Sequence, residues 1–441
     1  MSENIEIQNN LPKDWGKVKL GEVATFQTGK REKGGAKTSG GVPSIGGEHI
    51  TEDGKINFYD SPKYISPAFF QNMKKGKVNI GDVLLVKDGA KTGKSAIVRK
   101  GISKHMAVNE HVFVIRSKNQ SLILTEFIGF WFHSNQAWKQ IKRAYHGLIG
   151  GINRKQLSNF ILPLPSFPEQ KAIAFVLRSV QEAKEATEKV ISSLKELKKS
   201  LMKHFFTYGP VPINQKSQVK LKETEVGQIP EHWEVVKLKE VTKFMKAGGT
   251  PKRSETKFWR GNIPFVLVRD LTSCGIYLNK TEETITEEGL NNSSAWLVPP
   301  RSLLLSMYAT IGETAVNTIP VATNQAILAL IPNDTFHVEF GAYLLKFHSK
   351  RLAKYNVQST QKNINKGIVK NFPIPLPPIE EQEKMAEILK AVDEKIEAEE
   401  KRKEALESLF KSLLNNLMTA KIRLPEEFIK KFEEESNELR K

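Results

Sequence analysis

The sequence repeats itself, in the same order, over most of its length. The segment "LPKDWGKVKLGEVATF" at 11–26 matches "IPEHWEVVKLKEVTKF" at 229–244, and "GINRKQLSNFILPLPSFPEQ" at 151–170 matches "NINKGIVKNFPIPLPPIEEQ" at 363–382. Between them, "AVNEHVFVI" from Ala107 matches "ATNQAILAL" from Ala322, and "FHS" at 132–134 recurs at 347–349. Because the matches keep their order at a spacing of roughly 215 residues, the chain is a tandem duplication whose two copies must fold alike.

Each copy begins with a segment in which short apolar runs alternate with turns rich in Gly, Asn and Lys. The runs "GDVLLV", "EHVFVI", "RSLLLSM" and "QAILAL" predict short strands. One amphipathic helix is expected in each copy, near residues 124–141 and 340–355, with its aromatic side chains in the core. The expected fold class is therefore α+β, with two globular domains in tandem.

A long helix is predicted at the end of each copy, directly after the proline-containing segments "LPLPSFPEQ" and "IPLPPIEEQ". Apolar residues in both helices recur at spacings of three and four, which is typical of a coiled-coil seam. The predicted seam of the first helix consists of Ile173, Val176, Val180, Ala183, Thr187, Val190, Leu194, Leu197 and Leu201. The second helix matches at its ends, with Met385, Ile388, Val392, Leu406, Leu409 and Leu413, whereas Lys395, Glu399 and Arg402 interrupt its middle. We expect the two helices to pair with each other; the alternative is that each packs on its own domain.

These patterns divide the chain into five segments. The first globular domain is assigned to residues 1–165 and the central helix to residues 166–208. A linker and the second globular domain occupy residues 209–377, and the C-terminal helix follows at 378–424. The acidic tail, 425–441, has no counterpart in the first copy and is expected to form a short extra helix.

The net charge of +18 is concentrated in the globular domains. Residues 11–160 carry 25 Lys and Arg against 11 Asp and Glu, a net charge of +14, and residues 229–372 carry 18 against 12, a net charge of +6. Residues 380–404 are acidic, with 6 basic and 10 acidic side chains. Two basic blocks beside an acidic helix favour a polyanionic partner, although a generally basic surface is the alternative.

Composition excludes several classes of protein. The chain has one cysteine, Cys274, so it can form neither an internal disulfide nor a cysteine zinc cluster. The N-terminal segment "MSENIEIQNN" is polar, and no window approaches the roughly 18 apolar residues of a membrane helix. A soluble protein of a reducing compartment, the cytoplasm, is expected.

The segment "KDGAKTGKSAIV" at 87–98 is similar to a nucleotide-binding P-loop, but its spacing is wrong. Three residues separate Gly89 from Gly93, whereas the P-loop needs four between its glycines so that backbone N–H groups can surround the phosphates. In the second copy Gly93 matches Gly312, while Lys94 is replaced by Glu313. The glycine is therefore expected to serve a positive φ or a close backbone approach, and Lys94 to contact a DNA phosphate.

The whole layout resembles the specificity (S) subunit of type I restriction–modification systems. The resemblance rests on two variable domains, each followed by a helix that begins at "LPLPSFPEQ" (162–170) or "IPLPPIEEQ" (374–382). It also rests on "IPEHWEVVKLKEV" at 229–241, "TNQ" at 323–325 and "TQKNINKG" at 360–367. The first copy departs from this pattern with "VNE" at 108–110, which fits either two unlike half-sites or ordinary drift.

The resemblance implies a function and a set of partners. Each target-recognition domain would read one half of a bipartite, asymmetric site in double-stranded DNA. The two helices would form an antiparallel coiled coil with pseudo-two-fold symmetry that sets the spacer and docks two methyltransferase (M) subunits. S-adenosylmethionine would belong to the M subunits, and ATP with Mg²⁺ to the restriction (R) subunits. The chain itself would bind no cofactor or metal and would not be catalytic, which agrees with the lack of an Asn-Pro-Pro-Tyr, P-loop or HExxH motif in the sequence.

Candidate DNA contacts are basic or amide side chains on the predicted loops, because such groups reach phosphates and base edges. In the first domain they are Lys30, Arg31, Lys33, Lys37, Lys87, Lys91, Thr92, Lys94, Asn109, Arg143, Tyr145, His146, Asn153 and Arg154. In the second domain they are Lys252, Arg253, Lys257, Arg269, Tyr308, Thr310, Asn324, Gln325, Gln361, Lys362 and Asn363. Alternatives remain open: Asn109 and Asn324 as turn caps, Tyr145 and Tyr308 as packing residues, and the isolated lysines as solvated surface.

Two other classes of protein remain possible at the level of sequence. A nuclease or methyltransferase with doubled recognition domains would need a catalytic motif, and acidic residues are too common to exclude a nuclease site by inspection. A structural adaptor that binds proteins through its globular ends is disfavoured by the +14 charge of the first domain.

Overall fold

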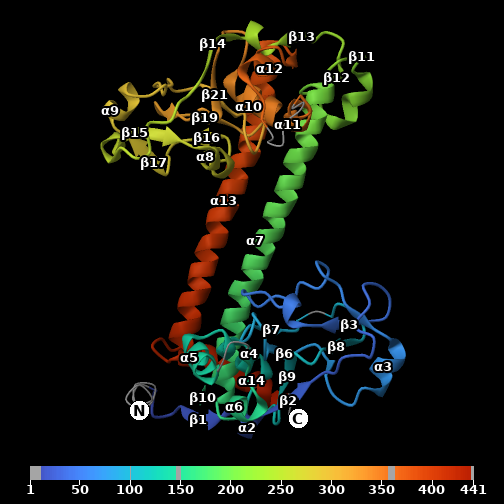
Figure 1. Cartoon of the computed structure of the whole chain (residues 1–441). Coiled ribbons are helices and arrows are strands. Elements are labelled where there is room, and N and C mark those ends of the chain that lie inside the picture. Colours follow the sequence, from blue (N-terminus) through green and yellow to red (C-terminus); the bar gives the residue numbers. More distant parts are fainter. Residues whose placement is uncertain (1–10, 100, 146–149, 356–362, 439–441) are drawn as a thin grey trace. The chain divides into compact units, whose positions relative to one another are not determined.

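The computed structural model describes residues 11–99, 101–145, 150–355 and 363–438, and it divides into two compact units. Unit 1 is Met1–Ala186 with Arg402–Lys441, and unit 2 is Thr187–Lys401. The long helices α7 (Phe167–Tyr208) and α13 (Ile379–Met418) contribute one end to each unit (Figure 1). Each unit therefore combines one globular domain with half of both long helices.

The globular part of unit 1 is built on two four-stranded sheets. The first has the order β2-β9-β6-β7, the second has the order β4-β3-β8-β5, and β1 pairs with β10. The strands are β1 (Gly16–Lys19), β2 (Ala24–Thr28), β3 (Val42–Ile45), β4 (Tyr64–Ile65), β5 (Lys77–Val78), β6 (Val83–Val86), β7 (Ser95–Ile97), β8 (Met106–Val108), β9 (Val112–Ser117) and β10 (Ile161–Leu164). The helices are α2 (Leu20–Val23), η1 (Gly47–His49), α3 (Pro67–Asn72), α4 (Thr125–Phe132), α5 (Asn135–Ala144) and α6 (Arg154–Ser158).

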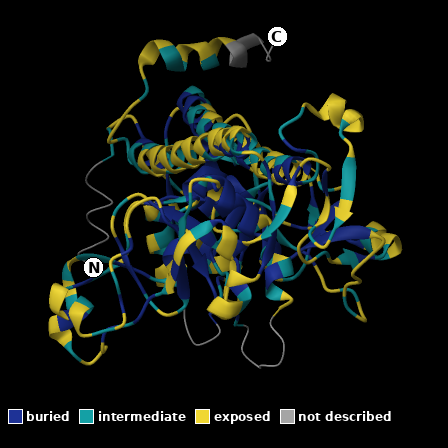
Figure 2. Cartoon of the chain, turned by 90° about the horizontal axis from the view of Figure 1, so that it is seen from above, coloured by how far each residue is buried: buried dark blue, intermediate teal, exposed yellow. Residues whose placement is uncertain are grey.

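Strand β6 lies at the centre of the first sheet and is buried on both faces. Val83 and Leu85 join the core that contains α4 and the long helices, whereas Leu84 and Val86 join the core shared with the second sheet. Alternate side chains of a strand point to opposite faces, so two cores require a continuous apolar run such as "VLLV". Buried residues fill the interior of the globular domains in Figure 2.

Unit 2 repeats this plan. Its sheets have the orders β14-β21-β18-β19-β16 and β17-β15-β20, and the two-stranded pairs are β11-β12 and β13-β22. The strands are β11 (Leu221–Thr224), β12 (Gly227–Pro230), β13 (Glu234–Lys237), β14 (Thr242–Ala247), β15 (Trp259–Val266), β16 (Tyr277–Leu278), β17 (Glu283–Ile285), β18 (Leu303–Ser306), β19 (Thr314–Asn317), β20 (Ala322–Thr323), β21 (Ile327–Pro332) and β22 (Pro373–Leu376). The helices are η2 (Ile213–Gln218), η3 (Leu238–Glu240), η4 (Thr256–Phe258), α8 (Val268–Ser273), α9 (Glu287–Asn291), α10 (Val338–Phe347), α11 (Ser349–Ala353) and α12 (Lys366–Lys370).

The duplication extends to strand register. Gly16 of β1 lies opposite Leu164 of β10, and in unit 2 Glu234 of β13 lies opposite Leu376 of β22, which are the matching positions of the two copies. The four short apolar runs that predicted strands contain β6 and β18 and overlap β9 and β21, so the α+β expectation is confirmed.

The amphipathic helix expected in each copy is broken in two. In unit 1 the break falls at His133 and Ser134, and the Ser134 hydroxyl accepts a hydrogen bond from the Ala137 N–H to begin α5. In unit 2 the chain breaks at His348, between α10 and α11. Both breaks lie in the repeated "FHS" segment, but only Ser134 caps the following helix; in unit 2 the N-cap residue of α11 is His348, without a side-chain cap.

The glycine that was expected to require a positive φ or a close backbone approach shows both features in each copy. Gly93 has φ of 88° and Gly312 has φ of 89°, which is the left-handed region. A Cβ on Gly93 would lie 2.8 Å from Ile141, and one on Gly312 would lie 2.4 Å from Ser349. The similarity to a P-loop therefore reflects a turn that both copies share.

The two long helices run antiparallel in each unit. In unit 1, Leu177 of α7 shares a buried cluster with Leu414 of α13. In unit 2, the Lys198 Nζ of α7 lies 2.6 Å from the Asp393 Oδ1 of α13. Residue numbers rise along α7 as they fall along α13, so the predicted pairing of the two helices is confirmed, in the antiparallel direction that the resemblance implied.

The helix face that is buried in α7 differs from the predicted seam at every second position. Leu177 and Ile191 are buried, whereas Val190 is 42% exposed and Val176 is half-buried. The other predicted positions, Ile173, Val180, Ala183, Thr187, Leu194, Leu201, Met385, Val392, Leu406 and Leu413, are buried or half-buried. The apolar pattern therefore identified half of the seam, and the alternating half lies one residue further along the chain.

Two lysines explain the difference in α7. The side chain of Lys184 is largely buried and its Nζ lies 3.4 Å from the Asp53 Oδ2, while Lys198 pairs with Asp393. A lysine can bury its four-carbon stem when a carboxylate receives its ammonium group. A pattern based on apolar residues prefers Leu197, which is 46% exposed, to the neighbouring lysine.

The same shift occurs in α13. Leu389 and Ile396 are buried, whereas Ile388 is half-buried and Leu409 is 45% exposed. Ile396 supplies the apolar residue that the predicted seam lacked in the middle of this helix. Glu399 is also buried there and pairs with Lys395.

Asp53 joins a loop of the first domain to α7, and its substitution should destabilise unit 1. Burial opposes its ionisation, but the Thr51 hydroxyl and the ammonium groups of Lys55 and Lys184 outweigh burial and lower its pKa to about 2. Because the folded-state pKa is depressed, the stabilisation is present above the unfolded pKa and is lost as the pH falls through about 2. We expect Asp53→Asn to lower the free energy of unfolding by about 1 kcal/mol near neutral pH, after allowing for partial solvent screening.

Urea unfolding at several pH values would measure this effect. The difference between the original chain and Asp53→Asn should shrink as the pH falls from about 4 towards 2. Asp334→Asn is a suitable control, because Asp334 is 92% exposed in its pair with Lys243. A difference that does not vary with pH would contradict the ionic explanation.

Candidate nucleic-acid interface

Several of the predicted loops of unit 1 come together beside the end of β6. The Lys87 N–H donates to the His111 carbonyl (2.9 Å), and the Ile152 N–H donates to the Lys87 carbonyl (2.6 Å). The Gly29 N–H donates to the Asn109 carbonyl (3.2 Å). The loops near residues 29, 87–94, 109–111 and 150–154 therefore form one cluster, although they are distant in sequence.

Unit 2 builds the same cluster from the matching segments. The Met307 N–H donates to the Ala326 carbonyl (2.8 Å), and the Ile364 N–H donates to the Met307 carbonyl (3.0 Å). The Gly249 N–H donates to the Thr323 carbonyl (3.0 Å). A scaffold that is conserved between the copies therefore presents loops whose side chains differ.

A matching glycine in each copy permits this close approach. A Cβ on Gly29 would lie 1.6 Å from the Val108 carbonyl oxygen, and one on Gly248 would lie 1.8 Å from the Thr323 carbonyl oxygen. No side chain fits at these distances, so glycine is required at both positions.

The basic loop after β2 is anchored by its own acidic residue. The Glu32 carboxylate accepts hydrogen bonds from the Ser66 N–H (2.9 Å) and the Ser66 hydroxyl (2.5 Å), which lower the pKa of Glu32. Lys30, Arg31 and Lys33 are exposed and form no ion pair within the described chain. The charges of these three side chains are thus available to an anion. Lys37 is also exposed, and its charge helps to lower the pKa of Glu32.

The lysines of the loop at 87–94 are more constrained. Lys87 Nζ lies 3.0 Å from the Asp88 Oδ2, and Lys94 Nζ lies 2.9 Å from the Glu52 Oε1. Lys91 Nζ donates to the Glu48 carbonyl (2.8 Å). Thr92 donates through its hydroxyl to the Gly89 carbonyl (2.7 Å) and thereby stabilises the turn.

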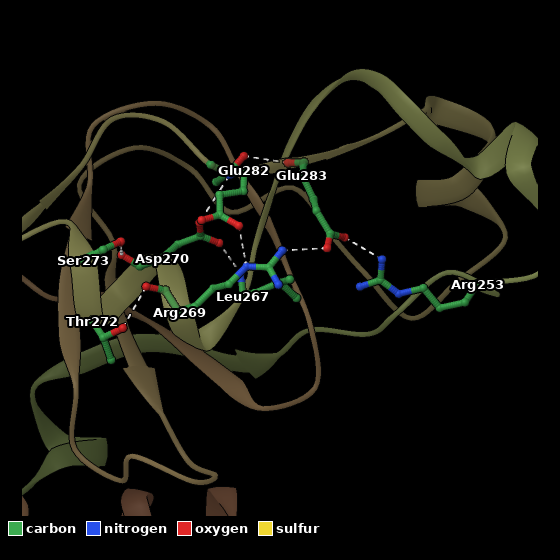
Figure 3. Close-up of polar contacts among 9 residues, drawn as sticks. Arg253, Leu267, Arg269, Asp270, Thr272, Ser273, Glu282 and Glu283 are labelled. Atoms are coloured by element: carbon green, nitrogen blue, oxygen red, sulfur yellow. Dashed lines mark hydrogen bonds and ion pairs between the residues drawn. The ribbon is translucent and has the colours of Figure 1, made fainter. Parts of the chain in front are cut away.

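In unit 2 the candidate cations that the structure describes are paired with carboxylates. Figure 3 shows Glu283 between two arginines, with its Oε2 2.5 Å from Arg253 Nη1 and its Oε1 2.8 Å from Arg269 Nη2. Arg269 also contacts Glu282 through Nε (2.7 Å), and Arg253 stacks over the ring of Trp259 at 3.8 Å.

The lysines of this region are paired in the same way. Lys252 pairs with Glu255, and Lys257 pairs with Glu288. The local charge in unit 2 is therefore largely compensated, whereas the loop after β2 in unit 1 is not.

The amide candidates have structural roles in addition to any role in recognition. The Asn109 Oδ1 accepts from the His111 N–H (2.9 Å), and the Asn324 Oδ1 accepts from the Ala326 N–H (3.1 Å). Both asparagines therefore cap turns, which is the alternative that the sequence left open for them. Asn153 caps α6 through its side-chain oxygen.

The remaining candidates lie at or near the same clusters. The Arg154 guanidinium donates to the Phe26 carbonyl, and the Gln325 Oε1 accepts from the Thr250 hydroxyl (2.6 Å). Tyr308 pairs with Asn363 through an isolated β-bridge, and Tyr145 and Tyr308 are 40% and 38% exposed. Arg143 lies in the last turn of α5, and Thr310 lies in the turn before Gly312. The candidates His146, Gln361 and Lys362 lie outside the described residues.

The sequence did not single out His111 or Thr250. His111 Nδ1 lies 2.5 Å from the Asp88 Oδ1, and the imidazole is 52% exposed within the cluster of unit 1. Its only signal in the sequence was its place two residues after Asn109. Thr250 follows the glycine pair of the loop after β14 and had no such signal.

The described residues contain neither a cluster of three metal-ligating side chains nor a helix long and apolar enough to cross a membrane. What the loop clusters offer chemically is positive charge and hydrogen-bonding groups on rigid turns, which suits binding of a polyanion.

Comparisons with known proteins point to one family. The model of the type I restriction modification DNA specificity domain matches residues 12–196 and 230–408. The MjaVIII specificity subunit of a type I restriction enzyme from Methanocaldococcus jannaschii is 29% identical over 439 residues, which cover 96% of both chains. The HindI specificity subunit from Haemophilus influenzae is 21% identical over 323 residues, 60% of this chain and 69% of the relative.

The structure of the S subunit of a type I restriction–modification system from M. genitalium has the same fold. It aligns with a TM-score of 0.61 at 17% identity and covers 93% of this chain and 96% of that chain.

Proposed function

We propose, from the premise that this chain belongs to the family of type I restriction–modification DNA specificity subunits, that each globular domain reads one half of a bipartite, asymmetric DNA site. Specificity subunits recognise DNA, while catalysis belongs to other subunits of the complex. The observation that carries the proposal is the pair of matching loop clusters, because one scaffold presents two different sets of side chains.

The domain limits follow the sequence assignment. Residues 1–165 and 209–377 contain the two target-recognition domains, including a linker at the start of the second, and residues 166–208 and 378–424 contain the connecting helices. We assign phosphate contacts to the exposed cations of the loop after β2 and base contacts to the amide and hydroxyl groups of the clusters. The antiparallel helices would set the spacer between the half-sites.

The partners that we propose are two methyltransferase subunits, docked on the helical part, and restriction subunits in the full complex. S-adenosylmethionine would be held by the methyltransferase subunits, and ATP with Mg²⁺ by the restriction subunits. The chain would contribute the DNA sequence preference and no cofactor.

Sequencing of modified bases would test the proposal directly. A host would express this chain with its cognate methyltransferase subunit, and a control host would express the methyltransferase subunit alone. We expect methylated adenines in one split motif, only when this chain is present. No new modification, from a complex shown to assemble, would contradict the specificity role and favour the adaptor alternative.

A further inference from the structure

The two copies hold a matching carboxylate at the start of each long helix. The Trp15 Nε1–H donates to the Glu169 Oε2 (3.0 Å), and the Trp233 Nε1–H donates to the Glu381 Oε2 (2.9 Å). The next residue of each helix is a buried glutamine that makes the same set of backbone hydrogen bonds in both units. The two carboxylates are therefore equivalent positions of one scaffold.

In unit 1 the carboxylate also binds an arginine from the segment after α13. Arg423 Nε donates to the Glu169 Oε1 (3.0 Å) and Arg423 Nη2 donates to the Glu169 Oε2 (2.9 Å). The same Nη2 lies 2.8 Å from the Asp14 Oδ2. A two-pronged guanidinium–carboxylate contact with a second carboxylate beside it is a strong and directional arrangement.

Unit 2 has no arginine at the matching position. Each long helix ends in a left-handed residue, Ala420 (φ 55°) after α13 and Gly209 (φ 79°) after α7, so Arg423 corresponds to Pro212. The counterpart of Asp14 is His232, whose Nε2 lies 2.8 Å from the Glu381 Oε1 and whose side chain is 56% exposed.

In unit 2 a cavity of about 710 Å³ adjoins Glu381 and His232. These residues correspond to Glu169 and Asp14, which hold Arg423 in unit 1. Its charged lining consists of three carboxylates, Glu231, Glu380 and Glu381, and two lysines, Lys220 and Lys384, with His232 beside them. Tyr208, Pro210 and Val211 supply an apolar side. A carboxylate next to apolar surface suits an arginine, which buries its aliphatic stem and presents its guanidinium group.

We propose that this cavity of unit 2 is a receptor site for an arginine-bearing peptide segment of a protein partner. The arginine would displace the exposed imidazole of His232 and bind Glu381, as Arg423 binds Glu169 in unit 1. Its stem would lie along Tyr208 and Pro210. The site is thus filled from within the chain in unit 1 and open to a partner in unit 2.

A synthetic peptide of residues 419–434, "TAKIRLPEEFIKKFEE", is the probe, because it contains the arginine that fills the matching site. Its binding to the full-length chain, without DNA, would be followed by fluorescence anisotropy. Peptides with Arg423→Lys or Arg423→Ala are controls, and we expect the lysine peptide to bind about tenfold more weakly because it loses the two-pronged contact. The tethered tail of the chain has a high effective concentration at its own site, so the free peptide should not displace it.

Two surface variants of unit 2 locate the binding. His232→Asp recreates the acidic neighbour that Asp14 provides in unit 1, and it should tighten binding roughly threefold to tenfold. Glu380→Lys places a cation at the exposed rim and should weaken binding by a similar factor. Both side chains are exposed, so neither variant is expected to disturb folding, which circular dichroism would check.

Three outcomes would overturn the inference. The first is no binding by either the original chain or His232→Asp, and the second is equal binding of the arginine and alanine peptides. The third is peptide binding that neither variant changes, since the site would then lie elsewhere. If Glu380→Lys instead abolished self-association of the chain, the occupant would be a second copy and the partner-peptide proposal would fail.

Discussion

Replacement of Lys30, Arg31 and Lys33 with alanine should weaken binding of the cognate duplex by about a hundredfold near 0.15 M salt. These three side chains are exposed, and no carboxylate of the described chain pairs with them. Each phosphate contact that is lost should remove about 0.9 from the slope of log affinity against log salt, so the triple variant should lose up to about 2.7. A salt titration by fluorescence anisotropy, with the methyltransferase subunits present, would measure both quantities.

The second domain supplies a matched control. Lys252, Arg253 and Lys257 occupy the corresponding region, but Glu255, Glu283 and Glu288 already neutralise them. Figure 3 shows the pair of Arg253 with Glu283. Their replacement with alanine should change the salt slope by less than about 1, because a compensated cation releases few counterions from DNA. Equal effects of the two triple variants would show that local charge compensation does not decide which domain binds phosphates.

The sequence predicted most of the architecture, because the duplication provided two independent views of one fold. The aligned runs "GDVLLV" and "RSLLLSM" predict one strand in each copy that is buried on both faces, and β6 and β18 are these strands. The repetition also predicted that α7 and α13 pair with each other, whereas their antiparallel direction was implied by the resemblance to specificity subunits. The break in each amphipathic helix falls at the repeated "FHS", a boundary that the apolar periodicity alone does not predict.

Features that depend on single side-chain contacts could not be predicted. The choice between Leu197 and Lys198 in the seam depends on Asp393, which lies on the other helix. Likewise, the difference between Arg253, which is paired, and Arg31, which is not, depends on where Glu283 and Glu32 are held. Residue type indicates which groups can bind DNA, but only the fold shows which of them already have a partner.

Shortening the coiled coil should have a second large effect, which is a change in the spacing of the recognised half-sites. Helices α7 and α13 contain 42 and 40 residues, and each residue adds about 1.5 Å to a helix. Deleting residues 189–195 of α7 together with 398–404 of α13 removes one heptad from each and keeps the phase of the seam. The two deletions remove Lys195 and Glu400 together, which form an ion pair (2.8 Å), so neither is left without its partner.

We expect the double deletion to shorten the spacer of the methylated motif by about three base pairs, because seven residues span about 10.5 Å and a base pair about 3.4 Å. Modification of the original motif should be lost, while the bases of both half-sites stay the same. Sequencing of modified bases in a host with the methyltransferase subunit would report spacer and half-sites in one experiment. Deletion from α7 alone is the control, since it places the two helices out of register and should abolish modification altogether. An unchanged spacer in the double deletion, with both half-sites still read, would show that the helices do not set the distance between the two recognition domains.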